Sequence, residues 1–197
     1  MSENLSGGLF FMAMDNFKEE VIVKRHNGLN NVVYYLMWVI MIANALIGFM
    51  MIQSVIYSIQ TGFDWVSLIA CLLLIGIAVL IWWKKDGLRV EYEYTFTNGT
   101  LDVSEVLNNS KRKYLAEIPM KLVESAGSVL NPSFNRYIND KNIKKHNWFL
   151  NRDADLIYLY FTKNGVKRLA ILEPSAEMQD MMHSRGYMNF GVWQETK

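Results

Sequence analysis

The sequence is poor in the residues that build most catalytic and metal sites. It has one cysteine, Cys71, and three histidines, His26, His146 and His183, spread over 197 residues. A single cysteine excludes an intrachain disulfide and gives no zinc-ligand spacing. No glycine-rich phosphate loop, nucleophile elbow or His-Glu-x-x-His motif occurs. We therefore expect no enzyme, no cofactor and no metal site.

The chain also lacks an excess of charge of one sign. Twenty Lys and Arg stand against 19 Asp and Glu, which gives a formal net charge of +1. Bulk charge thus gives no reason to expect a nucleic-acid partner. The basic residues have to be judged by their positions instead.

Two long stretches contain no Asp, Glu, Lys or Arg at all. One lies between His26 and Asp64, and the other between Asp64 and Lys84. Within them, residues 32–59 and 65–83 can each cross a hydrocarbon core of ~30 Å as a helix, since roughly 20 residues suffice. We predict two transmembrane helices that an external loop, residues 60–64, connects.

The flanks of these stretches predict the topology. The basic residues at the flanks are Lys24, Arg25, Lys84, Lys85 and Arg89, whereas the loop carries only Asp64. The positive-inside rule then places both termini in the cytoplasm, as in a multi-pass cell-membrane protein. No Asp, Glu, Lys, Arg or His lies within either predicted span, so we do not expect a channel or transporter.

Asn44 and Gly48 are the predicted packing positions of the first transmembrane helix. An amide in hydrocarbon needs a partner, so Asn44 is expected to bond across to the second helix or to another copy of the chain. Small residues such as Gly48 let helices approach closely. A homo-oligomer is compatible with this pattern.

Residues 1–31 form the predicted N-terminal cytoplasmic segment. Asp15 or Asn16, followed by two glutamates, fits the start of a capped helix. We predict an amphipathic helix over residues 17–25 that lies along the inner leaflet. Residues 1–11 contain no Lys or Arg, so no signal peptide is expected, and Met12 and Met14 are alternative initiators.

After the second stretch the pattern changes to the two-residue period of strands. Asn98-Gly99, a strong hairpin signal, separates strands predicted at residues 89–97 and 100–106. Further on, the sequence predicts a turn at 108–109, a strand at 111–118 that ends at Pro119, and a fourth strand within 120–129. We expect these strands to pair antiparallel.

The remaining third of the chain divides into an irregular part and a regular part. Residues 130–150 lack a clear period, and we predict one short strand near Trp148 and Phe149. A second hairpin is predicted at 156–161 and 166–172, across a turn containing Gly165. A helix over 175–185 is then predicted, with Ser175 as its cap, Gly186 as its stop and a face formed by Met178, Met181 and Met182 that closes one end of the sheet.

Three parts of the sequence carry a family resemblance. They are the opening strand Arg89-Val-Glu-Tyr-Glu-Tyr-Thr-Phe-Thr-Asn-Gly-Thr-Leu101, the basic strand Lys111-Arg112-Lys113 that continues to Pro119, and the terminal helix. With the hairpin, they resemble bacterial two-span membrane proteins with a C-terminal pleckstrin-homology-like (PH-like) domain, of the YcxB and YdbS type. Residues 14–25 are also similar to the start of a Firmicutes membrane-protein family. The resemblance implies a membrane α-helical hairpin plus a mainly β (α+β) cytoplasmic domain, residues 88–197, with an antiparallel sheet or barrel capped by a C-terminal helix.

A basic interval in this domain is the candidate binding site. Its members are Lys111, Arg112, Lys113, Arg136, Lys141, Lys144 and Lys145. They would bind anionic lipid or an acidic partner, since each basic side chain near an anionic bilayer contributes ~1 kcal/mol, but a solubilising face has the same composition. We predict a membrane-anchored, non-enzymatic interaction or scaffold module with a protein partner at a sheet edge or sheet–helix groove, and, as the alternative, an anionic-lipid headgroup sensor.

Overall fold

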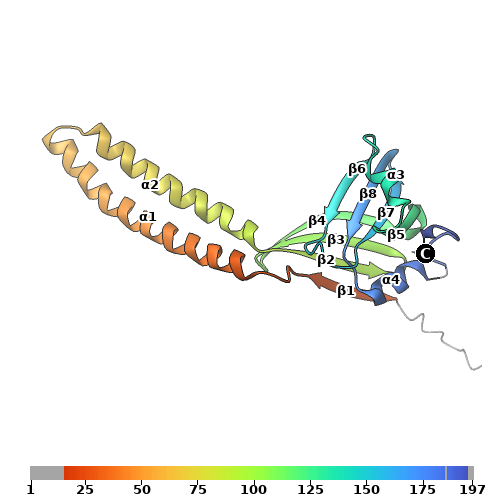
Figure 1. The fold of residues 1–197 in the computed structure, drawn as a ribbon. Coiled ribbons are helices and arrows are strands. Elements are labelled where there is room, and N and C mark those ends of the chain that lie inside the picture. The colour runs from red at the N-terminus through yellow and green to blue at the C-terminus, as the bar shows by residue number, and fades with distance from the viewer. Residues whose placement is uncertain (1–15, 185, 195–197) are drawn as a thin grey trace, which may run out of the picture.

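The computed structural model describes residues 16–184 and 186–194 of the chain. A long helical hairpin extends from a β domain made of two sheets (Figure 1). The predictions for residues 1–15, among them Asp15 as a cap and Met12 or Met14 as an initiator, lie outside the described residues. So does Arg185, the predicted end of the last helix.

The two uncharged stretches form the helices α1 (Gly28–Thr61) and α2 (Trp65–Lys84). Gly62, with a φ of +136°, ends α1, and the Asp64 side chain caps α2 by accepting hydrogen bonds from the backbone N–H groups of Val66 and Ser67. Both helices are long and apolar enough to cross a membrane. Their outer faces expose large apolar side chains along most of their length.

Residues 17–22 form a strand, β1 (Phe17–Ile22), and the predicted amphipathic helix is wrong. β1 pairs antiparallel with β2 (Val90–Thr97), from Phe17 opposite Thr97 to Ile22 opposite Tyr92. The sequence was ambiguous because Phe17 and Val21, four residues apart, share a face in a helix and in a strand alike. The segment forms a strand because it can pair with the edge of β2 that β3 leaves open.

Sheet A has the strand order β1-β2-β3-β4, with β3 (Thr100–Leu107) and β4 (Lys111–Pro119) joined by hairpins as predicted. Asn98 and Gly99 have φ values of +48° and +89°, and Asn108 and Asn109 have +50° and +52°. Positive φ at both central residues is what a two-residue hairpin turn requires. The local turn chemistry therefore sets this part of the fold.

Sheet B has the strand order β6-β8-β7-β5-β9. Its strands are β5 (Val123–Ser128), β6 (Lys144–Trp148), β7 (Ile157–Lys163), β8 (Val166–Leu172) and β9 (Trp193–Gln194). The predicted hairpin β7–β8 is confirmed, but β6 pairs parallel with β8 and β9 parallel with β5, so the sheet is mixed. The predicted fourth strand does not continue sheet A, because the 3₁₀ turn Met120–Leu122 after Pro119 redirects the chain into sheet B.

The two sheets enclose the core and do not close into a barrel. Tyr94, Phe96 and Leu101 of sheet A pack there against Leu159 and Leu172 of sheet B. Helix α4 (Ala176–His183), capped by Ser175, adds the fully buried Met178 and Met182 to this core. A short unpredicted helix, α3 (Phe134–Ile138), covers a second cluster around Tyr158 on the opposite face of sheet B.

Candidate functional site at the base of the helical hairpin

The helical hairpin continues directly into neighbouring strands of sheet A. β1 leads into α1, and α2 leads through the 3₁₀ turn η1 (Lys85–Leu88) into β2. Because β1 and β2 are paired antiparallel, the end of β1 lies beside the start of β2, and both helices leave the domain at the same end of the sheet (Figure 1). The orientation of the domain therefore depends on the residues around this junction.

A buried ion pair lies at the end of α2. Lys85 and Asp86 are 6% and 7% exposed, and the Lys85 Nζ is 2.9 Å from the Asp86 Oδ1. Lys111 of β4 approaches the other carboxylate oxygen, with its Nζ 2.9 Å from Oδ2. Hydrogen bonds from Lys85 and then Lys111 lower the pKa of Asp86, against the opposing effect of burial. The carboxylate is thus held ionised between hairpin and domain.

Aromatic side chains of α1 cover the cations of this junction. The Lys85 Nζ lies 4.8 Å from the ring centroid of Trp38, and the Arg89 Cζ lies 3.9 Å from that of Tyr34. Both distances suit a cation–π contact. The Asn108 side chain, from the β3–β4 turn, donates to the Tyr34 hydroxyl and to Asp86 at 3.3 Å each. One network therefore joins both helices to sheet A.

Asn151 fixes the linker between β1 and α1 to sheet B. Its Oδ1 accepts from the Arg25 N–H at 2.8 Å, and its Nδ2 donates to the Val23 carbonyl at 3.0 Å and to the Glu173 carboxylate at 2.7 Å. Asn151 and Glu173 are 6% and 7% exposed. Buried polar side chains with satisfied hydrogen bonds of this kind hold a segment in one position.

A groove of about 450 Å³ lies between β1 and the start of α4. Glu20 of β1 lines the groove and accepts hydrogen bonds from the backbone N–H and the hydroxyl of Ser175. Arg25, Asp155 and Gln179 line the remainder with apolar neighbours. β1 is an edge strand of sheet A, so the groove runs beside a strand edge.

Two of the predicted basic site residues are already paired. Lys111 contacts Asp86, as described, and the Arg112 Nη2 lies 2.6 Å from the Glu93 Oε1. Burial and the neighbouring Glu19 raise the pKa of Glu93, while Arg112 opposes this shift. Lys111 and Arg112 therefore contribute less free positive charge than the sequence suggested.

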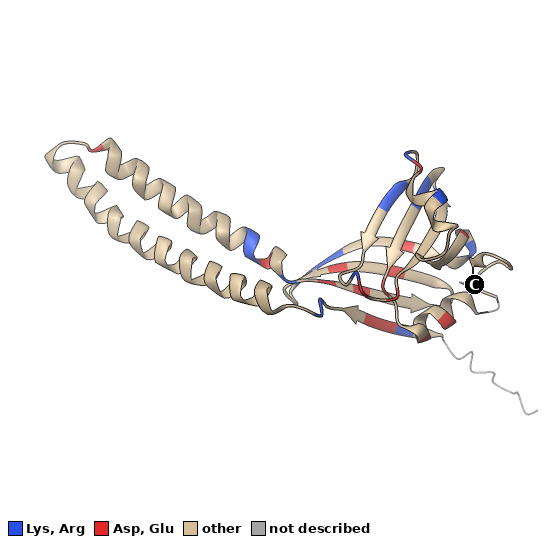
Figure 2. Cartoon of the chain, viewed as in Figure 1, with Lys and Arg blue, Asp and Glu red and all other residues tan. Residues whose placement is uncertain are grey.

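The predicted basic residues do not form one patch. Lys111 lies beside the hairpin, whereas Glu117, six positions along β4 and roughly 20 Å away by strand rise, contacts Lys163 at the end of β7. Lys144 is opposite Arg168 of β8, and Arg168 lies two residues after Val166, where β8 begins. Lys163 pairs with Val166 at this β7–β8 turn, so Lys144 lies near the end of the domain that Glu117 contacts. The other members of this second group are Arg136, Lys141 and Lys145, while Lys113 stays with Lys111 and Arg112 on β4. Figure 2 shows the resulting separation of basic residues on β4 from those on β6.

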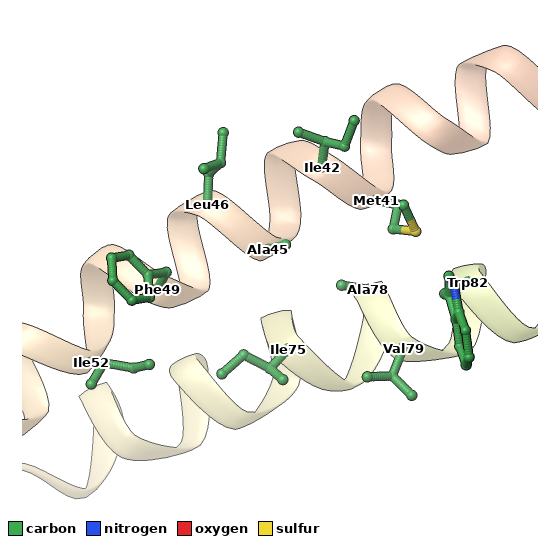
Figure 3. A pocket seen from close by; sticks show the side chains of 10 residues that line it. All are labelled: Met41, Ile42, Ala45, Leu46, Phe49, Ile52, Ile75, Ala78, Val79 and Trp82. Carbon is green, nitrogen blue, oxygen red and sulfur yellow. The ribbon is translucent and has the colours of Figure 1, made fainter.

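The two predicted packing positions of α1 differ in what they contact. Asn44 donates to the Ile40 carbonyl of its own helix at 2.8 Å, in place of the predicted bond to α2. Gly48 faces α2 closely, since its carbonyl lies 3.4 Å from the Cys71 Sγ and an added Cβ would be 3.0 Å from Ile75. An apolar groove of about 460 Å³, lined only by side chains of the two helices, lies between them (Figure 3).

Sequence reasoning missed the junction itself. Lys85 and Arg89 were taken as flanking charges of a membrane span, and neither Asp86 nor Tyr34 was singled out. The signal that could have indicated the junction is Asp86, a single acidic residue among basic residues directly after an apolar helix. Asn151 gave no signal, because its partners Val23 and Glu173 are distant along the chain.

The chain matches the model of one protein family, described as a bacterial PH-like domain (DUF6106), over residues 14–189. No curated protein and no solved structure matches it significantly. The family match spans the helical hairpin, sheet A and every strand of sheet B except β9, and it confirms the predicted resemblance to PH-like bacterial proteins. The chain belongs to this family.

Proposed function

We propose that this member of the bacterial PH-like family is a membrane-anchored, non-catalytic interaction module. The hairpin crosses the bilayer, and the domain lies at the cytoplasmic face. Support comes from the length and exposed apolar surface of both helices and from the basic residues at their domain-side ends. Asp64, at the other end of the hairpin, is the single charge between α1 and α2.

The observation that carries the proposal is the junction built around Asp86. A tether that only kept the domain near the membrane would need no buried contacts at its base. Here Lys85 and Lys111 both bind Asp86, and Asn151 holds the connection between β1 and α1. The domain therefore presents fixed faces relative to the bilayer, which favours a partner that also lies at the membrane.

We place the protein partner in the groove between β1 and α4. An extended peptide can add to the free edge of β1 through main-chain hydrogen bonds, a common mode of recognition at sheet edges. Asp155 lines the groove, is exposed and is in no ion pair within the described residues, so a peptide with a basic side chain fits the groove best.

The test is site-specific photo-cross-linking of the full chain in its native membrane. A benzophenone amino acid at Val21 or Gln179, both lining the groove, is expected to capture one discrete partner. The matched control is Val166, an exposed apolar residue at the β7–β8 turn. Absence of any product at the groove positions, or the same product at Val166, would contradict the proposal.

The second candidate function, an anionic-lipid sensor, keeps only part of its predicted site. Lys141, Lys144 and Lys145 are exposed, and none is in an ion pair within the part of the chain that the structure describes. Hydrogen exchange of the full chain in nanodiscs tests them. Protection of residues 139–148 is expected to rise when phosphatidylglycerol replaces phosphatidylcholine, and equal protection in both lipids would rule the sensor out.

A further inference from the structure

A cavity of about 380 Å³ lies at the root of the hairpin. Three separate segments form it: the β1–α1 linker, the start of β2 with the turn before it, and the β6–β7 connection. Its polar lining includes Lys24, Asn27, Asn30, Asn147 and Arg152. No Asp or Glu lines it, in contrast to the groove beside β1.

The two cations of this cavity are free to bind a ligand. Lys24 and Arg152 are exposed, and neither is in an ion pair in the described part of the chain. The adjacent Arg25, by contrast, pairs with Asp153 at 3.5 Å. Two unpaired cations around a cavity without carboxylates indicate an anion as ligand, and the planar guanidinium suits phosphate oxygens.

Side-chain amides add donors around the same space. Asn27 stands at the N-cap of α1 but makes no side-chain cap hydrogen bond. Asn30 donates to the Leu88 carbonyl at 3.3 Å, which holds that wall of the cavity in place. The Asn27 amide is thus available to a ligand between Lys24 and Arg152.

Apolar side chains beside the cavity point to a ligand that is only partly polar. Val90 and Leu150 line the cavity. Leu88 and Phe149 are in the cavity wall. A small soluble anion would leave this apolar surface uncovered, whereas acyl chains beside α1 would cover it.

We propose that this cavity binds the phosphate headgroup of an anionic phospholipid in the leaflet next to the domain. Lys24 and Arg152 contact the phosphate, Asn27 donates to it, and the apolar part of the lipid lies against Leu88 and Phe149. The proposal rests on the membrane crossing put forward above but not on the peptide groove. It also uses none of the basic residues of β4 or β6.

Native mass spectrometry of the full chain, released from nanodiscs of mixed phosphatidylcholine and phosphatidylglycerol, tests the site. The wild type is expected to retain phosphatidylglycerol in preference to phosphatidylcholine. Each basic side chain near an anionic lipid is worth about fivefold in binding, so Lys24→Gln with Arg152→Gln is expected to reduce retention roughly 25-fold. Lys121→Gln with Lys167→Gln removes the same charge at exposed positions outside both proposed lipid sites and is expected to leave retention unchanged.

Three results would overturn the proposal. The first is no preference of the wild type for phosphatidylglycerol, and the second is equal loss in the Lys121 and Lys167 control, which would indicate diffuse attraction. The third is displacement of the lipid by inorganic phosphate, which would assign the cavity to a soluble phosphate compound. Should the double variant fold poorly, Arg152→Gln alone, with an expected loss of about fivefold, keeps the test decisive.

Discussion

The Nζ of Lys111 lies 2.9 Å from the Oδ2 of Asp86, and this contact joins the first residue of β4 to the turn that follows α2. The other oxygen of Asp86 binds the buried Lys85. Taking charges out of water is costly, so such a pair adds little net stability. Its effect is to favour one arrangement, because movement of the hairpin against the domain would separate Lys111 of β4 from the buried Asp86.

Asp86→Asn is expected to destabilise the protein by about 3 kcal/mol, because Lys85 then stays buried without its carboxylate. Since the folded-state pKa of Asp86 is lowered, the stabilisation is present above its ordinary value near 3.8 and is lost as the pH falls through the folded-state pKa. Denaturant unfolding in detergent at several pH values measures both effects. Asp153→Asn, at an exposed ion pair, is the control with an expected change of less than about 1 kcal/mol. Equal stability of wild type and Asp86→Asn at neutral pH would contradict the prediction.

Asn151→Ala is expected to loosen the connection between β1 and α1. The side chain makes hydrogen bonds with Arg25, Val23 and Glu173, and at about 1 kcal/mol each their loss costs about 3 kcal/mol. Limited proteolysis is expected to cut residues 23–27 faster in the variant. Asn139→Ala, which removes an exposed bond within one helical turn, is the control, and similar cleavage in both variants would argue against the role of Asn151.

Gly48→Val is expected to separate α1 from α2. An added Cβ would be 3.0 Å from the Ile75 side chain, and overpacking of this kind costs about 1–3 kcal/mol. Cys71, buried against Gly48, reports the change without an added probe, so maleimide labelling in detergent is expected to become faster. Gly76→Val is the matched control, because nothing lies within 4 Å of a Cβ added there. Unchanged labelling of Gly48→Val would show that the helices do not pack closely at this point.

Relative to the wild type, Glu93→Gln is expected to raise the free energy of unfolding more at neutral pH than at acid pH. Burial and Glu19 raise the folded-state pKa of Glu93, so its stabilising contribution is complete below the ordinary pKa and is lost as the pH rises through the raised value. The amide resembles the protonated acid and avoids that loss. Unfolding at pH 4 and pH 7 measures the difference, with Glu124→Gln at an exposed position as the control for the loss of one carboxylate. A larger benefit at pH 4 than at pH 7 would show that the Arg112 ion pair dominates instead.

The parts of the fold that depend on local chemistry could be predicted from the sequence. Asn98-Gly99 and Asn108-Asn109 adopt the positive φ values that tight hairpins need, and Ser175 caps its helix. The uncharged stretches form helices because each is apolar all round and bounded by Gly62 and Asp64. None of these features requires a distant partner.

The parts that depend on distant partners could not be predicted. β1 pairs with a strand some 70 residues later in the chain. β6 pairs parallel with β8, although β7 lies between them in the sequence, and no local hydrophobic period encodes this choice of partner. The ion pairs within the candidate basic site could not be predicted for the same reason. Lys111 and Arg112 looked like free charges because their carboxylate partners, Asp86 and Glu93, are 25 and 19 residues away.

The orientation of the hairpin in the membrane is expected to place the α1–α2 loop outside and the β domain inside. Cysteines at Gly62 or Gly165 would be strained, since both residues have positive φ, so Thr61→Cys and Val166→Cys are the better probes in a chain whose Cys71 has been replaced. A membrane-impermeant maleimide is expected to label Thr61→Cys in intact cells and Val166→Cys only after permeabilisation, because the basic residues lie at the domain end of both helices. The reverse pattern would place the domain outside the cell. Lys24 and Arg152 would then face the outer leaflet, and the lipid and peptide proposals would both have to be tested against ligands on that side.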